Sequence, residues 1–375
     1  MRKPLFEVRG LRIAVADERR AIAGGKGPTT DDGEQLSPGW VELLNGVSYS
    51  VDEGEVLGLV GESASGKSLM LMGAFGLLSS GGRVIGGTSV YRGHEYQPFF
   101  PWRGQDDKRS RKEKKQRRIA GTVVASYTDS AWARLVGTEV GFMFQNPLGA
   151  WTPDVVIGEQ SGEALSEHTE LTSEEIEERV YNALGEVNLP QSKRLFGAFR
   201  HQLSRGMAQR AMLAAALTKA PRLLIADEPL NGLDAPVAAS IMELISDMQE
   251  KRNMAMIFIT HDLASVARIA NRVGVVYGGQ IVEQASVTDI YHHPKHPYTA
   301  GLIGAIPGAS SERLSQIEGE APLLVDIDRS GCSFTERCPY ATDLCRSESP
   351  EVLVVEGTEV RCHRATELRL RGVGG

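Results

Sequence analysis

Runs of apolar residues, each bounded by turn-forming or acidic residues, predict the β-strands of this chain. The N-terminal part contains three such runs. Residues 16–40, which are rich in Gly, Pro and Asp and favour a loop, lie between the first and the second run, and the turn DEGE lies between the second and the third. In the second half, two continuous apolar runs end in acidic or polar residues, which is typical of buried parallel strands. The five strands are predicted over LFEVRGLRIAV (5–15), LLNGVSYSV (43–51), EVLGLV (55–60), RLLIADEP (222–229) and MAMIFITHD (254–262).

Helical patterns lie between these strands. A helix is predicted from about residue 67 to 78, and two more over SEEIEERVYNALGEV (173–187) and MAQRAMLAAALTKA (207–220). The first of these two has a start like a capping box, with Thr172 or Ser173 followed by acids. Residues 92–135 contain the run GQDDKRSRKEKKQRR without an apolar period, so we expect a peripheral charged insertion there.

Length and composition set the broad class. A chain of 375 residues is too long for one ordinary core and predicts two domains, or one large domain with additions. The 41 basic and 48 acidic side chains leave a net charge of -7, which gives no overall electrostatic case for nucleic acid or an anionic surface. No apolar run has the length of a membrane span or a secretion signal, so we expect a cytosolic chain whose membrane role, if any, depends on a partner.

The octapeptide GESASGKS (61–68) fits the phosphate-loop pattern G-x-x-x-x-G-K-[ST], with a strand before it and a helix after it. In such a loop the backbone N–H groups and the helix N-terminus surround a β-phosphate, Lys67 reaches the β and γ oxygens, and Ser68 ligates magnesium. A chance Gly-Lys-Ser turn is the alternative. The expected backbone contacts come from Gly61, Ser63, Ala64, Ser65 and Gly66.

The run RLLIADEP supplies a second group. Its apolar residues put Asp227 at the carboxyl end of a buried strand, where the carboxylate can hold magnesium through water. The adjacent Glu228 is then positioned to polarise an attacking water. The alternative is a structural acidic pair at a strand end. A cation beside a base predicts nucleotide hydrolysis.

Four further elements follow in an order that resembles the ATP-binding-cassette ATPases over about residues 5–285. FMFQNP offers Gln145 to sense the γ-phosphate and magnesium, and FITHD offers His261 as the switch histidine. LSRGMAQR (203–210) stands in the signature position, and LNGLD (230–234) matches the loop after the second phosphate motif. For each element taken alone, the alternative is an ordinary loop or strand-end residue without a role in nucleotide binding.

The resemblance implies an α/β phosphate-loop cassette with a parallel-sheet core, an antiparallel β subdomain and a helical subdomain near residues 146–217. It also implies a head-to-tail dimer that holds ATP between the phosphate loop of one chain and the signature of the other. Ser204 and Gly206 would then act on the partner's nucleotide, and Ser68, Gln145 and Asp227 on magnesium in this chain's own site.

Three positions depart from the family pattern. Arg205 occupies the first glycine of the signature, which suggests an asymmetric pair with a second, different ATPase. Val15 occupies the position at which family members often have an aromatic residue that stacks on adenine. Trp40 either takes over this stacking role or is a packing residue. Ala64 replaces a frequent glycine in the phosphate loop, and we expect little consequence.

The tail resembles the C-terminal extension of oligopeptide and dipeptide importer ATPases, in which His296, Pro297, Tyr298 and Thr299 form a typical stretch. We expect a cassette over 1–285 and this extension over 286–375. For His292, His293 and His296 we prefer packing and turn roles. The extension continues through IEGEAP (317–322), GCSFTERCPYATDLC (331–345) and EVRCH (359–363).

Four cysteines cluster in the last 44 residues, which in a reducing compartment favours a metal site over disulfides. Their spacings are not those of common zinc knuckles. In family members with this pattern the thiolates hold a [4Fe-4S] cluster; zinc, or free or disulfide cysteines, remain alternatives. The ligands would be Cys332, Cys338, Cys345 and Cys362.

The resemblance implies the ATP-hydrolysing subunit of an importer for peptides or a similar solute, at the cytoplasmic face of the membrane. Its expected partners are integral membrane permease subunits, a second ATPase and, indirectly, an extracytoplasmic solute-binding protein, with no nucleic acid. The alternatives are a weakly hydrolysing regulatory subunit and a nucleic-acid-associated ATPase. The basic stretch 103–118 fits a solvated loop, a headgroup or partner contact, or nucleic acid.

Overall fold

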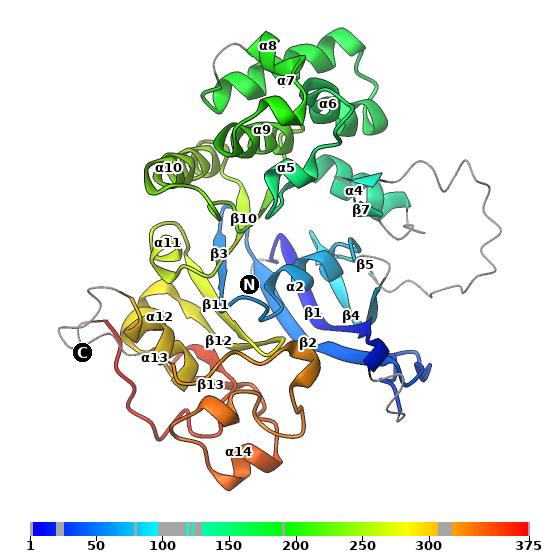
Figure 1. Cartoon of the computed structure of the whole chain (residues 1–375). Coiled ribbons are helices and arrows are strands. Elements are labelled where there is room, and N and C mark those ends of the chain that lie inside the picture. Colours follow the sequence, from blue (N-terminus) through cyan, green and yellow to red (C-terminus); the bar gives the residue numbers. More distant parts are fainter. Residues whose placement is uncertain are drawn as a thin grey trace.

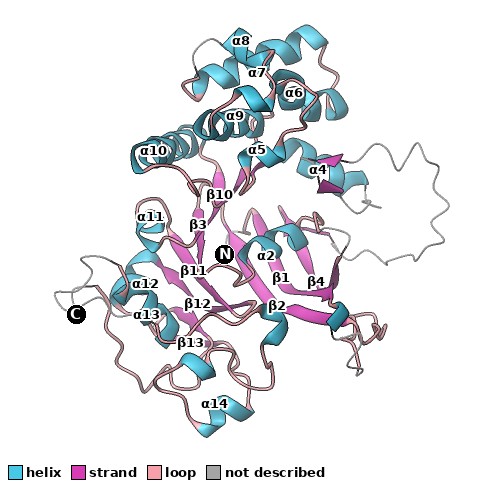
Figure 2. Cartoon of the chain, in the orientation of Figure 1, coloured by secondary structure: helices cyan, strands magenta, loops and turns pink. Residues whose placement is uncertain are grey.

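The computed structural model describes residues 3–19, 26–78, 81–96, 118–119, 122–123, 130–189, 192–306 and 317–373. Two sheets form the lower part of the molecule as drawn, and a layer of helices lies above them (Figures 1 and 2). The predicted α/β class is confirmed, because a mainly parallel sheet and an antiparallel sheet occur together with helices.

The larger sheet has eight strands in the order β13-β14-β12-β11-β3-β10-β9-β8. From β8 through β11 all neighbours are parallel, whereas β12, β14 and β13 are added antiparallel. Strands β3, β9 and β10 are buried along their whole length, as their unbroken apolar sequences predict. The bounds are β3 Val56–Val60, β8 Val140–Met143, β9 Leu223–Asp227, β10 Ala255–Thr260, β11 Arg272–Tyr277, β12 Gln280–Ser286, β13 Leu353–Val355 and β14 Thr358–Val360.

The smaller sheet is antiparallel, with the order β2-β1-β4-β5, and it contains two of the predicted N-terminal strands. The strands are β1 Phe6–Ala16, β2 Trp40–Val51, β4 Gly82–Tyr91 and β5 His94–Tyr96. A separate pair consists of β6 Arg118–Ile119 and β7 Thr122–Val123.

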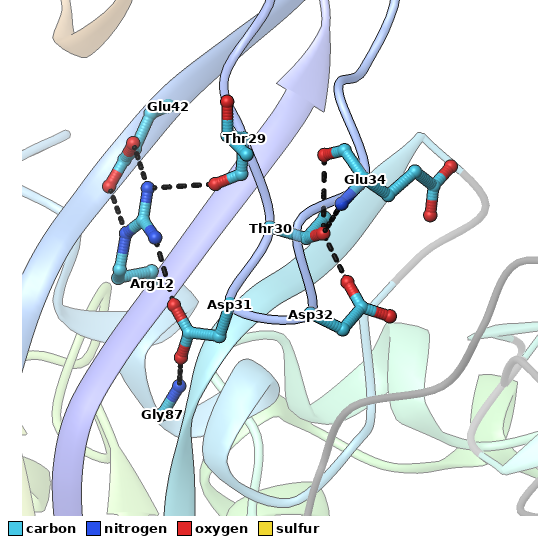
Figure 3. Close-up of polar contacts among 8 residues, drawn as sticks. All are labelled: Arg12, Thr29, Thr30, Asp31, Asp32, Glu34, Glu42 and Gly87. Carbon is cyan, nitrogen blue, oxygen red and sulfur yellow. Dashed lines mark hydrogen bonds and ion pairs between the residues drawn. The ribbon is translucent and has the colours of Figure 1, made fainter.

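The described part of the loop between β1 and β2 folds back over this sheet (Figure 3). Arg12 donates to both carboxylate oxygens of Glu42 and to Asp31, and Asp31 also accepts from the Gly87 amide. Thr30 hydrogen-bonds to Asp32 and to the Glu34 backbone. These contacts attach a Gly- and Pro-rich loop to strands β1, β2 and β4.

Some helices form the upper layer, and others lie beside the sheets in the lower part of the molecule (Figure 1). The predicted capping box is confirmed, because Thr172 and Glu175 exchange side-chain and backbone hydrogen bonds at the start of α7. The helix predicted over 67–78 ends at Ala74, where Gly76 follows with a φ of 69°. The helices are α2 Lys67–Ala74, α4 Ser130–Glu139, α5 Pro147–Ala150, α6 Ile157–His168, α7 Ser173–Glu186, α8 Ser192–Phe196, α9 Arg205–Leu217, α10 Ala235–Arg252, α11 Leu263–Ala267, α12 Val287–His292, α13 Pro297–Gly304 and α14 Asp343–Ser347, with 3₁₀ turns η1 Arg200–Gln202, η2 Leu324–Asp326 and η3 Thr335–Arg337.

The predicted insertion over 92–135 is too wide. It includes β5, which begins at His94, and its last residues start α4, whose Trp132 is 2% exposed. The Trp132 ring stacks on Phe75 and lies against Tyr96, so this end is part of a core rather than peripheral. The basic stretch 103–118 lies outside the described residues, apart from the strand that begins at Arg118.

The C-terminal part joins the larger sheet directly, because β14 pairs with β12. Tyr298 and Phe334 are buried in the same apolar core as β3 and β10. Among the described helices, none is both long and apolar enough to cross a membrane.

Candidate functional site

Four predicted site segments follow four neighbouring strands of the larger sheet. The phosphate loop follows β3, Asp227 ends β9, His261 follows β10 and Gln145 comes two residues after β8. The strands are adjacent in the order β8, β9, β10, β3, and all are parallel. Because the carboxyl ends of parallel strands meet at one edge of a sheet, the four segments share that edge.

The phosphate loop is a tight turn with positive φ angles at Ala64 and Gly66 and a close backbone approach at Gly61. Gly66, before α2, has a φ of 105°, and a Cβ on Gly61 would lie 2.2 Å from the Val276 carbonyl oxygen. Ala64 has a φ of 62°, in the left-handed region, which costs a residue with a Cβ on the order of 1 kcal/mol. The Lys67 ammonium donates to the carbonyls of Gly61 and Glu62, at 2.8 and 2.9 Å.

Ser68 and Asp227, two of the three predicted magnesium ligands, are in contact. Ser68 Oγ donates to Asp227 Oδ1 at 3.0 Å. Burial raises the pKa of Asp227 to about 6. Burial also lowers the pKa of Lys67, although the nearby carboxylates of Glu228, Asp227 and Glu62 act to raise it. A hydroxyl beside a buried carboxylate is a donor set that suits Mg²⁺, and a cation there would favour ionised Asp227.

Glu228 and His261 form the second contact at this edge. The Glu228 backbone has a φ of 49°, while its N–H donates to the Ile259 carbonyl of β10. Its side chain is 8% exposed, and Oε2 lies 2.8 Å from Nδ1 of His261, whose side chain is 54% exposed. The left-handed turn therefore places an almost buried carboxylate next to a solvent-accessible imidazole.

The signature residues lie elsewhere. Ser204 caps the N-terminus of α9 by accepting from the Met207 amide, and Gly206 lies in the first turn of that helix. Figure 1 places α9 in the upper helical layer, apart from α2 and the phosphate loop. Arg205 reaches the loop 230–234, where its guanidinium donates to the Gly232 carbonyl at 3.4 Å.

Trp40, the alternative to an adenine-stacking aromatic at Val15, lies in the smaller sheet. It lies opposite Ala16 in the β1–β2 pairing and packs against Ala14, Leu36 and Ile85. This environment favours the packing interpretation of Trp40.

Comparisons with known proteins agree with this arrangement. A family model described as "ABC transporter" matches residues 44–231, and one described as "Oligopeptide/dipeptide transporter, C-terminal region" matches residues 282–345. The dipeptide transport ATP-binding protein DppD of Escherichia coli is 37% identical over 334 residues, 88% of this chain and 93% of that protein. The oligopeptide transport ATP-binding protein AppD of Bacillus subtilis is 36% identical, over 86% and 90%.

The chain belongs to the ABC transporter family. It is therefore an ABC ATPase, for which ATP and Mg²⁺ are the expected ligands.

Solved structures agree on the fold. The ATP-binding cassette MJ0796, in a dimeric post-hydrolysis state bound to ADP and Pi, superposes with a TM-score of 0.55 and 19% identity over 75% of this chain and 98% of that one. The protein cbiO1 of Clostridium perfringens gives a TM-score of 0.53 and 21% identity over 77% and 91%.

The four cysteines of this ABC ATPase come together in space. All four line one small pocket, together with His296 and Phe334, and none forms a disulfide. Burial raises the pKa values of Cys332 and Cys338, and that of Cys362 to about 12, so a positive partner would be needed to hold thiolates there. Within the described ranges, no group of three or more His, Cys, Asp or Glu side chains is arranged to hold a metal ion.

Sequence reasoning missed Glu62 in the phosphate loop and Arg337 in the extension. Glu62, at one of the variable positions of the motif, accepts two hydrogen bonds from Arg337. The Glu62 amide also donates to the hydroxyl of Tyr298. The residue numbers of this pair differ by 275, so no local spacing in the sequence could have indicated it.

Proposed function

We propose that this ABC ATPase powers the import of dipeptides, oligopeptides or similar small solutes. The observation that carries the proposal is the joint match of cassette and tail: relatives named for dipeptide and oligopeptide transport align over most of the chain, and the matched tail carries the same description. The extension is also built into the nucleotide site, because Tyr298 and Arg337 contact the phosphate loop.

The edge of the larger sheet supports specific roles. Lys67 binds the β- and γ-phosphates, and Ser68 and Asp227 hold Mg²⁺ together with Gln145, which follows β8 at the same edge of the sheet. Glu228 orients and polarises the attacking water, and His261, at 2.8 Å, holds the Glu228 carboxylate in place. The phosphate is enclosed by backbone groups of Gly61, Ser63, Ala64, Ser65 and Gly66.

We further propose that Ser204 and Gly206 bind the nucleotide of a second, different ATPase, in a dimer with ATP at each interface. Their place at the N-terminus of α9 suits an anion, and the chain presents them apart from its own phosphate loop. The pair would drive integral membrane permease subunits from the cytoplasmic face, with an extracytoplasmic solute-binding protein delivering the cargo. Residues 1–285 would form the cassette and 286–375 the extension.

We further propose that the four-cysteine pocket holds a [4Fe-4S] cluster, as the resemblance of the tail implies, with zinc as the alternative. The pocket offers four free cysteines, which is the number of thiolates that such a cluster takes. Cys332, Cys338, Cys345 and Cys362 would hold the cluster, which would cross-link the extension.

An uptake assay tests the importer. Cells of the source organism that lack the chain would be given the wild type or Glu228→Gln, and uptake of a radiolabelled dipeptide, a longer peptide and a free amino acid would be measured. We expect peptide uptake to return only with the wild type. Normal peptide uptake without the chain would contradict the proposal.

The contact between Glu228 and His261 supports a hydrolysing subunit over a regulatory one, because both side chains are aligned at the site. Co-purification with membrane proteins rather than with nucleic acid or ribosomes would favour the importer over a nucleic-acid-associated ATPase.

A further inference from the structure

Glu62 is the point at which the C-terminal extension meets the phosphate loop. Its backbone N–H donates to Tyr298 Oη at 2.9 Å, and its carboxylate accepts two hydrogen bonds from Arg337, at 2.7 and 3.0 Å. On the loop side, its carbonyl accepts from the ammonium of Lys67 at 2.9 Å. One residue therefore links the extension with the lysine that serves the phosphates.

The pair between Arg337 and Glu62 has the geometry of a strong contact. The two terminal nitrogens of the Arg337 guanidinium each donate to one carboxylate oxygen of Glu62, and the side chains are 6% and 29% exposed. The same guanidinium donates to the carbonyls of Glu318 and Gly319 and lies over the Tyr277 ring. Arg337 is thus held by the extension on one side and by the loop on the other.

The position of Arg337 depends on the cysteine-bearing segment. Arg337 is the last residue of η3, a turn between the first two cysteines of the pocket. The Cys332 amide donates to the Cys345 carbonyl at 2.8 Å, and the Thr335 hydroxyl donates to that same carbonyl at 2.8 Å. A change in the packing of the cysteines would therefore move the turn that carries Arg337.

Tyr298 is fixed equally firmly. It is fully buried, and its ring contacts Tyr277 and Phe334. The start of its segment is held by the buried Glu283 carboxylate, which accepts from the amides of Lys295 and His296 at 2.6 and 2.9 Å. The hydroxyl that meets the Glu62 amide thus comes from a rigid support.

We propose that Arg337 and Tyr298 are positioning residues for ATP binding, and that through them the packing of the four-cysteine segment (residues 332–362) sets the nucleotide affinity. A phosphate loop binds well when its N–H groups and lysine are already in place. With Glu62 released, the carbonyl on which Lys67 rests is free to move, and that preorganisation is lost. The inference rests on the ATPase activity that family membership shows, and not on the transported solute.

A binding assay on the full-length chain tests the link. Titration with Mg²⁺ and a fluorescent ATP analogue, followed by steady-state ATP turnover, would compare the wild type with Arg337→Ala, Glu62→Gln and the double variant. We expect each single change to raise the Kd and the KM for ATP about fivefold to tenfold, the range of a modest coupling between sites, with kcat within about twofold. The double variant should be no weaker than either single one, because both remove the same contact.

Two comparisons separate positioning from general damage. Arg337→Lys should recover part of the affinity, because it keeps the charge and loses the paired donors. Arg346→Ala removes another cation of the same extension. The ion-pair partner of Arg346 is Glu336, which is 90% exposed, so this change should leave the Kd for the ATP analogue unchanged. Glu62→Gln leaves the extension untouched, so it reports on the contact even where Arg337→Ala fails to fold. A wild-type Kd in both single variants, or additive effects in the double one, would overturn the positioning role.

Cys345→Ser tests the second half of the proposal. Cys345 is buried in α14, and its carbonyl accepts from Thr335 of η3. Exchanging its buried thiol for a hydroxyl alters the packing around that carbonyl, and with it the turn that carries Arg337. A severalfold rise in the Kd for the ATP analogue is expected, and it should be absent when Arg337 is already alanine. A rise of the same size in both backgrounds, or none in the wild-type background, would overturn the dependence of affinity on the cysteine segment.

Discussion

Nδ1 of His261 lies 2.8 Å from Oε2 of Glu228, although the two residues are 33 positions apart and follow different strands. The contact exists because β9 and β10 are parallel neighbours whose carboxyl ends meet. It joins an almost buried carboxylate, at the end of a left-handed turn, to an accessible imidazole.

Glu228→Gln should keep ATP binding and lose turnover. The amide preserves the shape of the side chain but cannot act as a base, so we expect phosphate release to fall by about 10²- to 10⁴-fold with Kd for ATP unchanged. Phosphate release and analogue binding would be measured in parallel. The exposed Glu243→Gln on α10 is the matched control, and retained hydrolysis in Glu228→Gln would remove Glu228 from its role.

His261→Ala should lower turnover less than Glu228→Gln does, by roughly 10- to 100-fold, because the carboxylate remains but loses its hydrogen-bond partner. When both residues are changed, turnover should match that of Glu228→Gln alone, since residues that act as a unit are not additive. Single-turnover assays would measure this. Independent, multiplying losses would speak against a functional pair.

Asp227 should make the nucleotide-free chain less stable as the pH rises. Its folded pKa is about 6, above the unfolded value of about 3.9, so between these values the folded chain binds a proton that the unfolded chain has lost. Stability is then lost as the pH rises from about 4 through 6, by on the order of 3 kcal/mol, because one pKa unit corresponds to about 1.4 kcal/mol.

Asp227→Asn removes this titration. Its melting temperature should exceed that of the wild type at pH 7.5, and the difference should shrink as the pH falls toward 4. Differential scanning fluorimetry without nucleotide or Mg²⁺ would measure it, with the exposed Asp247→Asn as control. An equal difference at all pH values would contradict the burial argument.

Arg205→Gly should raise ATP turnover of the assembled complex severalfold, since it restores the usual signature and breaks the contact with Gly232. ATP binding to the chain alone should not change, because the signature is proposed to serve the partner's nucleotide. Arg205→Lys separates charge from bulk. Unchanged turnover of the complex with Arg205→Gly would count against the asymmetric pair.

The cysteines should bind iron. The chain purified without oxygen is expected to contain about four irons and to show the broad visible absorbance of an iron–sulfur cluster. Cys332→Ser and Cys362→Ser should each lose most of it, whereas Ser347→Ala in α14 should not. One zinc per chain without visible absorbance would favour the zinc alternative.

Local patterns predicted much of this ATPase. The strands over Val56–Val60 and Leu223–Asp227, the capping box at Thr172 and the phosphate loop all depend on neighbours in the chain, and the structure contains each of them. The edge of the core was harder to predict. The charged insertion predicted over residues 92–135 includes Trp132 because its charged run has no apolar period, yet the Trp132 ring is buried against Phe75.

The sequence by itself determined which residues can serve the phosphates, because a loop between a strand and a helix needs its glycines, lysine and serine at set spacings. Only the tertiary structure decided what holds that loop. Glu62 meets Tyr298 and Arg337 because β11, β12 and the extension are packed beside β3, and contacts between segments this distant arise from sheet order, which no local spacing records.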